Sequence, residues 1–216
     1  MHMASTMQVE RLQHPTDDQV EAMVEMAVEA FADDPAHRGF VGGNHKLSPL
    51  FFRAMACATA LDGEIYVVKD PTTSHIASFG LWFPPGKRLW ATDEQKALGY
   101  NEFFSKLSQE TQNWWRHTYP ETVAKLRERT WSKEDSERCW WCFNICTDRR
   151  HENLGYATAI VNFAYDKAKR NDQILGLSTG TDLNVRKYLA MGFRDRGQTW
   201  IDAPTGGWAV HTLSRE

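Results

Sequence analysis

The segment from Cys139 to Arg170 constrains the fold more than any other part of the chain. An apolar stretch at residues 139–146 is typical of a strand, and a small-residue loop at 152–157 then opens directly into a helix pattern. A strand, a glycine turn and a helix N-terminus in this order leave several backbone N–H groups unpaired, and the helix dipole adds about half a positive charge there. The segment therefore predicts an anion-binding cradle, whose natural occupant is a phosphate-bearing cofactor.

Length and composition indicate one globular domain. The 216 residues can form one well-buried core, and no Pro/Gly/Ser-rich linker or long charge run divides them. We therefore expect a single domain over residues 8–216. The opening Met-His-Met-Ala-Ser is typical of a vector-derived sequence, so residues 1–7 are taken as an unordered start outside the fold argument.

The bulk properties exclude several classes of protein. The formal net charge of -3 argues against a nucleic-acid binder, because such domains usually carry a basic excess. No apolar run approaches the roughly 20 residues that cross a bilayer, and no signal-peptide pattern opens the chain. The cysteine usage fits a reducing compartment, so we expect a cytoplasmic protein without membrane or nucleic-acid partners.

Three cysteines in the predicted strand, Cys139, Cys142 and Cys146, have a spacing that invites a metal site. Successive side chains of a regular strand point to opposite faces, which places Cys139 on one face and Cys142 and Cys146 on the other. Thiols on opposite faces cannot converge on one tetrahedral ion, and no fourth ligand is near them in the sequence. We therefore expect buried apolar thiols and no metal.

The remaining patterns predict an α/β fold with a mixed sheet. Strand patterns occur at residues 8–12, 64–69, 75–83, 139–146, 173–178, 193–201 and 208–213. Helix patterns run from a capping box at 16–19 to an Asp-Asp-Pro stop at 33–35, and over 48–60, 92–129, 154–170 and 183–191, with a break at Pro120. The strands at 64–69 and 75–83 form a predicted hairpin, and residues 87–137 a helical insertion that covers one side of the sheet. Strands that alternate with helices, with antiparallel pairs at both ends, are typical of a mixed sheet, here of about seven strands.

Two segments resemble a known family. The run from Ile145 to Ala157 resembles the acyl-CoA-binding motif of the GNAT superfamily of N-acetyltransferases, a strand followed by Gln/Arg-x-x-Gly-x-Gly/Ala at the mouth of a helix. The run from Asn184 to Phe193 resembles the second motif of that superfamily, in which a helix carries a tyrosine and ends in Gly-Phe. Residues 31–35 and 81–86 are also similar to a branch common among fungal members, whereas residues 86–138 match no part of the family pattern.

The resemblance implies a GNAT-like acyl-CoA N-acyltransferase fold with acetyl-CoA as co-substrate. Amides from Asn153 to Thr158 can bind the diphosphate, and Gly155 and Ala157 keep side chains out of its approach. The peptide-like pantetheine arm can pair with the end of the strand. The implied cofactor-binding residues are Ile145, Cys146, Thr147, Glu152, Asn153, Leu154, Gly155, Tyr156, Ala157, Thr158 and Asn184. A plain helix start at Gly155 is the alternative interpretation.

One position departs from the family pattern. Glu152 stands where the family has Gln or Arg, and a carboxylate beside a phosphate site is unfavourable unless it turns to solvent. Arg149, Arg150 and His151 immediately precede it and can compensate for its charge.

Tyr188 is the candidate catalytic residue. Acyl transfer expels a thiolate, and a phenol within hydrogen-bond reach can protonate or stabilise the departing sulfur. The alternative is a tyrosine that packs its ring on the sheet. The acceptor amine must also lose a proton, and the sequence leaves the base open among Asp33, Asp34, Glu64, Asp148 and Asp182, each of which also fits a cap, turn or solvated position.

The expected function is transfer of an acetyl group from acetyl-CoA to a primary amine of a small molecule, by direct attack. A non-catalytic acyl-CoA-binding or regulatory domain is the alternative, supported by Glu152 and by the lack of an obvious base. A nucleotide-binding fold is a weaker interpretation, because the chain has no Gly-x-Gly-x-x-Gly or lysine-bearing phosphate loop. The resemblance also favours a homodimer built on the last strands, while the residues themselves leave the oligomeric state open.

Nine tryptophans are unusual for this length. Trp82, Trp90, Trp114 and Trp115 can wall an aromatic pocket for the acceptor. The alternative is that these rings belong to the ordinary core.

Overall fold

The computed structural model describes residues 7–216. The expected vector-derived start therefore lies outside the described residues, except for Met7. The described strands form one seven-stranded sheet in the order β1-β2-β3-β4-β5-β7-β6. The strands are β1 (Val9–Leu12), β2 (Glu64–Lys69), β3 (Ile76–Phe83), β4 (Cys139–Thr147), β5 (Ile174–Thr179), β6 (Arg194–Ile201) and β7 (Trp208–Arg215). Neighbouring strands are antiparallel except for the β4–β5 pair, so the predicted mixed α/β sheet is confirmed.

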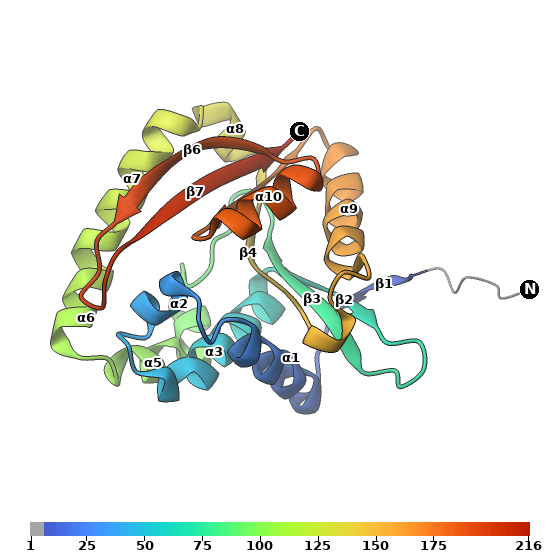
Figure 1. Cartoon of the computed structure of the whole chain (residues 1–216), viewed down its shortest axis with the longest axis horizontal. Coiled ribbons are helices and arrows are strands. Elements are labelled where there is room, and N and C mark those ends of the chain that lie inside the picture. The colour runs from blue at the N-terminus through green and yellow to red at the C-terminus, as the bar shows by residue number, and fades with distance from the viewer. Residues whose placement is uncertain (1–6) are drawn as a thin grey trace, which may run out of the picture.

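Helices cover both faces of the sheet (Figure 1). The α-helices are α1 (Asp17–Ala30), α2 (Pro35–Phe40), α3 (Ser48–Asp62), α4 (Asp93–Gln95), α5 (Asn101–Ser105), α6 (Gln109–Asn113), α7 (Tyr119–Thr130), α8 (Lys133–Glu137), α9 (Tyr156–Lys169) and α10 (Asp182–Ala190). Short 3-10 turns η1 (His45–Leu47) and η4 (Arg149–His151) and π-helical turns η2 (Lys96–Tyr100) and η3 (Trp114–Thr118) complete them. No helix within residues 7–216 combines the length and the hydropathy that a membrane span requires.

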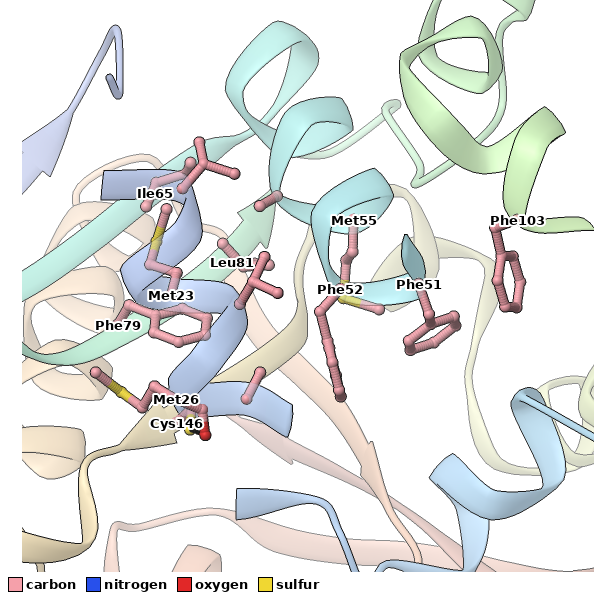
Figure 2. Close-up of a cluster of buried hydrophobic side chains, with 14 of the residues drawn as sticks. Met23, Met26, Phe51, Phe52, Met55, Ile65, Phe79, Leu81, Phe103 and Cys146 are labelled. Atoms are coloured by element: carbon pink, nitrogen blue, oxygen red, sulfur yellow. Dashed lines mark hydrogen bonds between the residues drawn. The ribbon is translucent and has the colours of Figure 1, made fainter. Parts of the chain in front are cut away.

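The core consists of two main clusters, one on each face of the sheet. On one face, side chains of α1 and α3 pack against β2 and β3, with Met23, Phe52 and Phe79 among them (Figure 2). On the other face, α9 packs against the centre of the sheet, where Ile160 meets Trp82. The central strands β2 to β5 are thus largely buried between helices on both faces, whereas the edge strand β6 is mostly exposed.

The predicted capping box opens α1. The Thr16 hydroxyl accepts a hydrogen bond from the Gln19 N–H, and the Gln19 side chain accepts one from the Thr16 N–H. We expect Thr16→Ala to lower the free energy of unfolding by about 1 kcal/mol, because one N–H of the first turn loses its acceptor. Urea unfolding followed by circular dichroism measures this, and Thr16→Ser, which keeps the hydroxyl, should stay close to the wild type.

The helical segment differs from the prediction at Pro120. Residues 109–130 form one continuous run of α6, η3 and α7, and Pro120 lies in the first turn of α7. Proline lacks the N–H that a helix interior requires. The π-helical turn η3, in which the Tyr119 N–H donates to the Trp114 carbonyl, tolerates it without a break. The earlier turn η2 packs on α3, and α7 packs on β6 along the edge of the sheet (Figure 1).

A bulge in β4 overturns the predicted face of Cys146, while Cys139 and Cys142 keep the opposite faces that were predicted. Leu81 pairs with Asn144 and Trp82 with Cys142, so Phe143 has no partner on β3. The extra residue shifts the alternation. Cys142 consequently packs in the cluster under α9, whereas Cys146 packs in the cluster under α1 and α3.

The predicted burial of the three thiols is confirmed. Burial raises the pKa of Cys139 to about 12 and that of Cys146 to about 12, and it raises the pKa of Cys142 as well. These groups are therefore protonated at neutral pH. Among residues 7–216, no cluster of His, Cys, Asp and Glu side chains could hold a metal ion.

Candidate active site

The central crevice lies where β4 and β5 separate. The two strands pair only from Cys139–Ile174 to Cys142–Leu177. Beyond that point β4 pairs with β3 alone, and the end of β5 pairs with β7 alone. The bulge at Phe143 lies at the point of divergence, and a bulge bends its strand. Residues 143–147 therefore have one backbone edge free toward a cavity of about 1360 Å³.

One end of this cavity is formed by the loop before α9. Asn153 and Gly155 both have left-handed backbones, with φ values of 61° and 84°. α9 begins at Tyr156, two residues later than predicted, and its first intrahelical bond runs from the Ala159 N–H to the Gly155 carbonyl. The N–H groups of residues 153–158 have no hydrogen-bond acceptor in the described part of the chain. These free amides at a helix N-terminus are suited to bind a phosphate group.

The loop is also open in front. A Cβ built on Gly155 would meet nothing closer than the Met7 Cε atom at 4.0 Å. Ala157 and Thr158 line the same end of the cavity. A side chain at position 155 would therefore project into open space in front of the loop.

Glu152 is exposed, as its charge requires beside a phosphate site. The basic side chains that precede it contact other carboxylates: Arg149 lies 3.4 Å from Glu29, Arg150 lies 2.6 Å from Asp148 and His151 lies 2.7 Å from Asp70. These three groups therefore compensate only in part for the negative charge of Glu152. Lys187 of α10 lines the cavity and has no ion pair within the described residues, so it is a further cation available to a phosphate.

Replacing Glu152 tests its effect on the cradle. We expect Glu152→Gln to lower the Kd for acetyl-CoA by about twofold to fivefold, because removal of one exposed like charge is a screened effect. Isothermal titration calorimetry at low salt measures this. Glu25→Gln, which removes an exposed charge from α1, should leave the Kd unchanged. An equal fall of the Kd in both variants would mean that the effect comes from the net charge of the protein and not from the position of Glu152.

Tyr188 lies on α10 and lines the cavity. Its ring meets Phe193 edge to face at 5.6 Å, and its hydroxyl forms no hydrogen bond with a described residue. Burial, and then the Cys142 and Cys146 thiols, raise the pKa of Tyr188. The hydroxyl is therefore a protonated donor at any pH near neutrality. Asn184, one helical turn earlier, lines the same cavity.

Comparisons with known proteins identify the fold. No family model matches the sequence, and no curated protein sequence matches it significantly. Arylalkylamine N-acetyltransferase 2 from Aedes aegypti superposes with a TM-score of 0.64 at 15% identity, covering 98% of this chain and 99% of that one. The structure has a GNAT-like fold. A Corynebacterium glutamicum protein described as histone acetyltransferase HPA2 and related acetyltransferase gives 0.61 at 20% identity, with 97% and 96% coverage.

A third structure carries the family name itself. A putative acetyltransferase of the GNAT family from Desulfovibrio desulfuricans has a TM-score of 0.55 at 10% identity and covers 98% of this chain and 99% of its own. The likeness to these three structures extends over nearly the whole chain. The expected fungal branch finds no support among them.

The five carboxylates considered as bases differ in whether they line the cavity. Asp34 alone lines the cavity, where it caps α2 through the His37 N–H at 2.9 Å, and burial raises its pKa. The other four lie outside the cavity lining. Glu64 contacts Lys167 and Arg11, Asp148 binds Arg150, and Asp33 and Asp182 are exposed.

Two polar side chains of the cavity were not predicted from the sequence. His37 is 3% exposed; its Nε2 atom lies 2.8 Å from the Ser48 Oγ atom, and its Nδ1 atom has no partner in the described chain. Burial, and then His45, lower the pKa of His37 to about 4, so the imidazole is neutral at pH 7. Asn144 of β4 is 6% exposed and its Oδ1 atom also has no described partner.

The aromatic wall of the cavity is only partly the predicted one. Trp90 and Trp115 line it, whereas Trp82 is buried under α9 and Trp114 packs against Trp208. Further aromatic lining comes from the C-cap of α1 and from α2, α3 and α7, namely Phe31, Phe40, Phe51, Phe52 and Tyr119. The cavity thus has a polar, amide-lined end at α9 and an aromatic flank at α2 and α3.

Proposed function

We propose that this protein is an N-acetyltransferase that transfers the acetyl group of acetyl-CoA to a primary amine of a small molecule. The observation that supports this most is the row of acceptor-free amides at residues 153–158 beside the separated ends of β4 and β5. A diphosphate fits the amides, and the peptide-like arm of the cofactor fits the free edge of β4 at Ile145, Cys146 and Thr147. Asn184 faces the same arm from α10.

The reaction proceeds by direct attack of the amine nitrogen on the thioester carbonyl carbon. A backbone N–H of β4 stabilises the oxyanion of the tetrahedral intermediate. As the intermediate collapses, the carbon–sulfur bond breaks and the Tyr188 hydroxyl donates a hydrogen bond to the sulfur, which leaves as thiolate or thiol. The buried thiols of the chain take no part, because their raised pKa values keep them protonated.

The acceptor amine loses its proton on the opposite side of the cavity. A neutral His37 and Asn144 can accept hydrogen bonds from an amine N–H, and Asp34 stands next to His37 in the wall. A pKa near 4 makes His37 a weak base. We therefore assign it the binding of an amine that arrives uncharged, with water as the final proton acceptor.

The test combines binding with turnover. Calorimetry with acetyl-CoA should show a single site, and release of free thiol should follow when amines from a panel are added. The Aedes aegypti neighbour is named for arylalkylamines, so arylalkylamines belong in that panel. Binding without thiol release by any amine would favour a non-catalytic acyl-CoA-binding domain, and no binding would exclude both functions.

Two further expectations belong to this proposal. We place the protein in the cytoplasm, where acetyl-CoA is available, and we propose a homodimer built on the last strands, β6 and β7. Cell fractionation tests the first, and light scattering coupled to gel filtration tests the second.

A further inference from the structure

The cavity extends past the aromatic wall to a second polar region, which we call the α7 end. It is formed by the loop after β3, by α7 and α8, and by the first half of β4. Its polar and aromatic lining residues include Lys87, Arg88, Arg127, Ser136, Glu137 and Trp141. None of these residues has a role in the chemistry described above.

Not every charged side chain at the α7 end has a partner of opposite charge. Lys87 is paired with Asp62, and Glu137 lies 3.7 Å from Lys133. Arg88 and Arg127 remain, and neither has a carboxylate within ion-pair distance in the described chain. Two guanidinium groups that face one cavity without a counter-ion repel each other. The pKa of Arg127 is accordingly lowered, first by burial and then by Arg88.

Arg127 is held in place by neutral groups. Its Nε atom lies 3.3 Å from the Ser136 Oγ atom, and its guanidinium stacks over the Trp141 ring at 5.7 Å from the centroid. The Nη1 atom forms no hydrogen bond with a described residue. A guanidinium that is oriented by packing and keeps free N–H groups is suited to bind a planar carboxylate or a phosphate.

The place of Arg127 along β4 indicates how long a ligand must be to reach it. Trp141 precedes the bulge at Phe143 by two residues, which corresponds to roughly 7 Å of strand. An anion at Arg127 would therefore lie about the width of one substituted aromatic ring from the point where β4 and β5 separate.

We propose that the acceptor is a primary amine that carries an anionic group, carboxylate or phosphate, bound by Arg127 and Arg88 at the α7 end of the cavity. The proposal rests on the acetyl-transfer function and narrows its substrate class. The aromatic flank holds the body of the acceptor, the two arginines hold its anion, and the amine points to the bulge of β4.

Matched acceptors test the proposal. Benzylamine, 4-(aminomethyl)benzoate and 4-(aminomethyl)phenylphosphonate differ only in the anion. We expect kcat/KM to be about tenfold or more higher for at least one of the two anionic amines than for benzylamine, because charge-assisted bidentate hydrogen bonds are among the strongest in water-facing sites. The ratio between the two anionic amines distinguishes carboxylate from phosphate recognition.

Variants locate the effect. The double variant Arg88→Gln/Arg127→Gln should lose this preference, while its kcat/KM for benzylamine stays within about twofold of the wild type. Lys125→Gln, which removes an exposed charge from the outer face of α7, should keep the preference. If the double variant does not fold, the single variants Arg88→Gln and Arg127→Lys replace it. Lysine keeps the positive charge but lacks the paired N–H groups with which a guanidinium binds a carboxylate or phosphate.

A binding measurement separates this proposal from the acetyl-transfer function. Benzoate and phenylphosphonate should raise the melting temperature of the wild type and not that of the double variant, with or without acetyl-CoA. If no amine is acetylated but these anions still bind, the function fails and the anion site stands. Equal kcat/KM for benzylamine and both anionic amines, or a preference that survives in the double variant, would overturn the anion site alone.

Discussion

Replacing Tyr188 by phenylalanine should lower the turnover number of acetyl transfer about a hundredfold and leave the affinity for acetyl-CoA nearly unchanged. The substitution removes one oxygen from a ring that packs on Phe193, so the fold and the cofactor site keep their contacts. What is lost is the donor that meets the sulfur as the carbon–sulfur bond breaks. Stopped-assay kinetics give the turnover number, and calorimetry with acetyl-CoA gives the affinity.

The pH dependence of the wild type supplies a second readout of Tyr188. Because burial raises the pKa of this phenol, its protonated form persists as the pH rises, and the turnover number should show no loss from its ionisation up to about pH 10. Tyr165→Phe is the matched control, since that hydroxyl lies outside the cavity and donates to the Glu216 carbonyl. A Tyr188→Phe variant with wild-type turnover would remove the residue from the mechanism.

The sequence predicted the parts of the site that depend on local backbone chemistry. A strand that ends in a Gly-containing loop before a helix fixes the order of elements, and Gly155 does adopt a left-handed backbone that few other residues accept. The capping box at Thr16 and the placement of Tyr188 on a helix that ends at Gly192 follow from short-range patterns in the same way. Local rules therefore located the proposed cofactor side of the cavity.

The acceptor side could not be read from the sequence because it depends on tertiary pairing. The bulge at Phe143 exists only in the register between β4 and β3, and it places Asn144 and Cys146 on the face opposite to the one that strict alternation assigns to them. His37 belongs to a six-residue helix whose only local signal is the Asp-Pro pair before it, and its neutrality comes from burial against α3. Arg127 and Arg88 are far apart in the chain and meet only in the folded cavity.

Blocking the cradle with a side chain should abolish tight cofactor binding. We expect Gly155→Val to raise the Kd for acetyl-CoA by about a hundredfold, because loss of two amide–phosphate hydrogen bonds at about 1.5 kcal/mol each corresponds to that factor. The left-handed backbone at this position, with φ of 84°, also strains a β-branched residue by about 1–3 kcal/mol. Calorimetry measures the affinity, and thermal unfolding measures the strain.

Gly86→Val separates the two effects. Gly86 has φ of 81°, and a Cβ at this position would meet no atom within 4 Å, so valine there carries the same strain without touching the loop before α9. Both variants should lose a similar amount of stability, and only Gly155→Val should lose acetyl-CoA affinity. A common loss of affinity would mean that strain is transmitted through the fold, and an unchanged affinity in Gly155→Val would mean that the diphosphate binds elsewhere. Because the amides of residues 153–158 are the observation on which the proposed function most depends, this comparison tests that function before any acceptor is known.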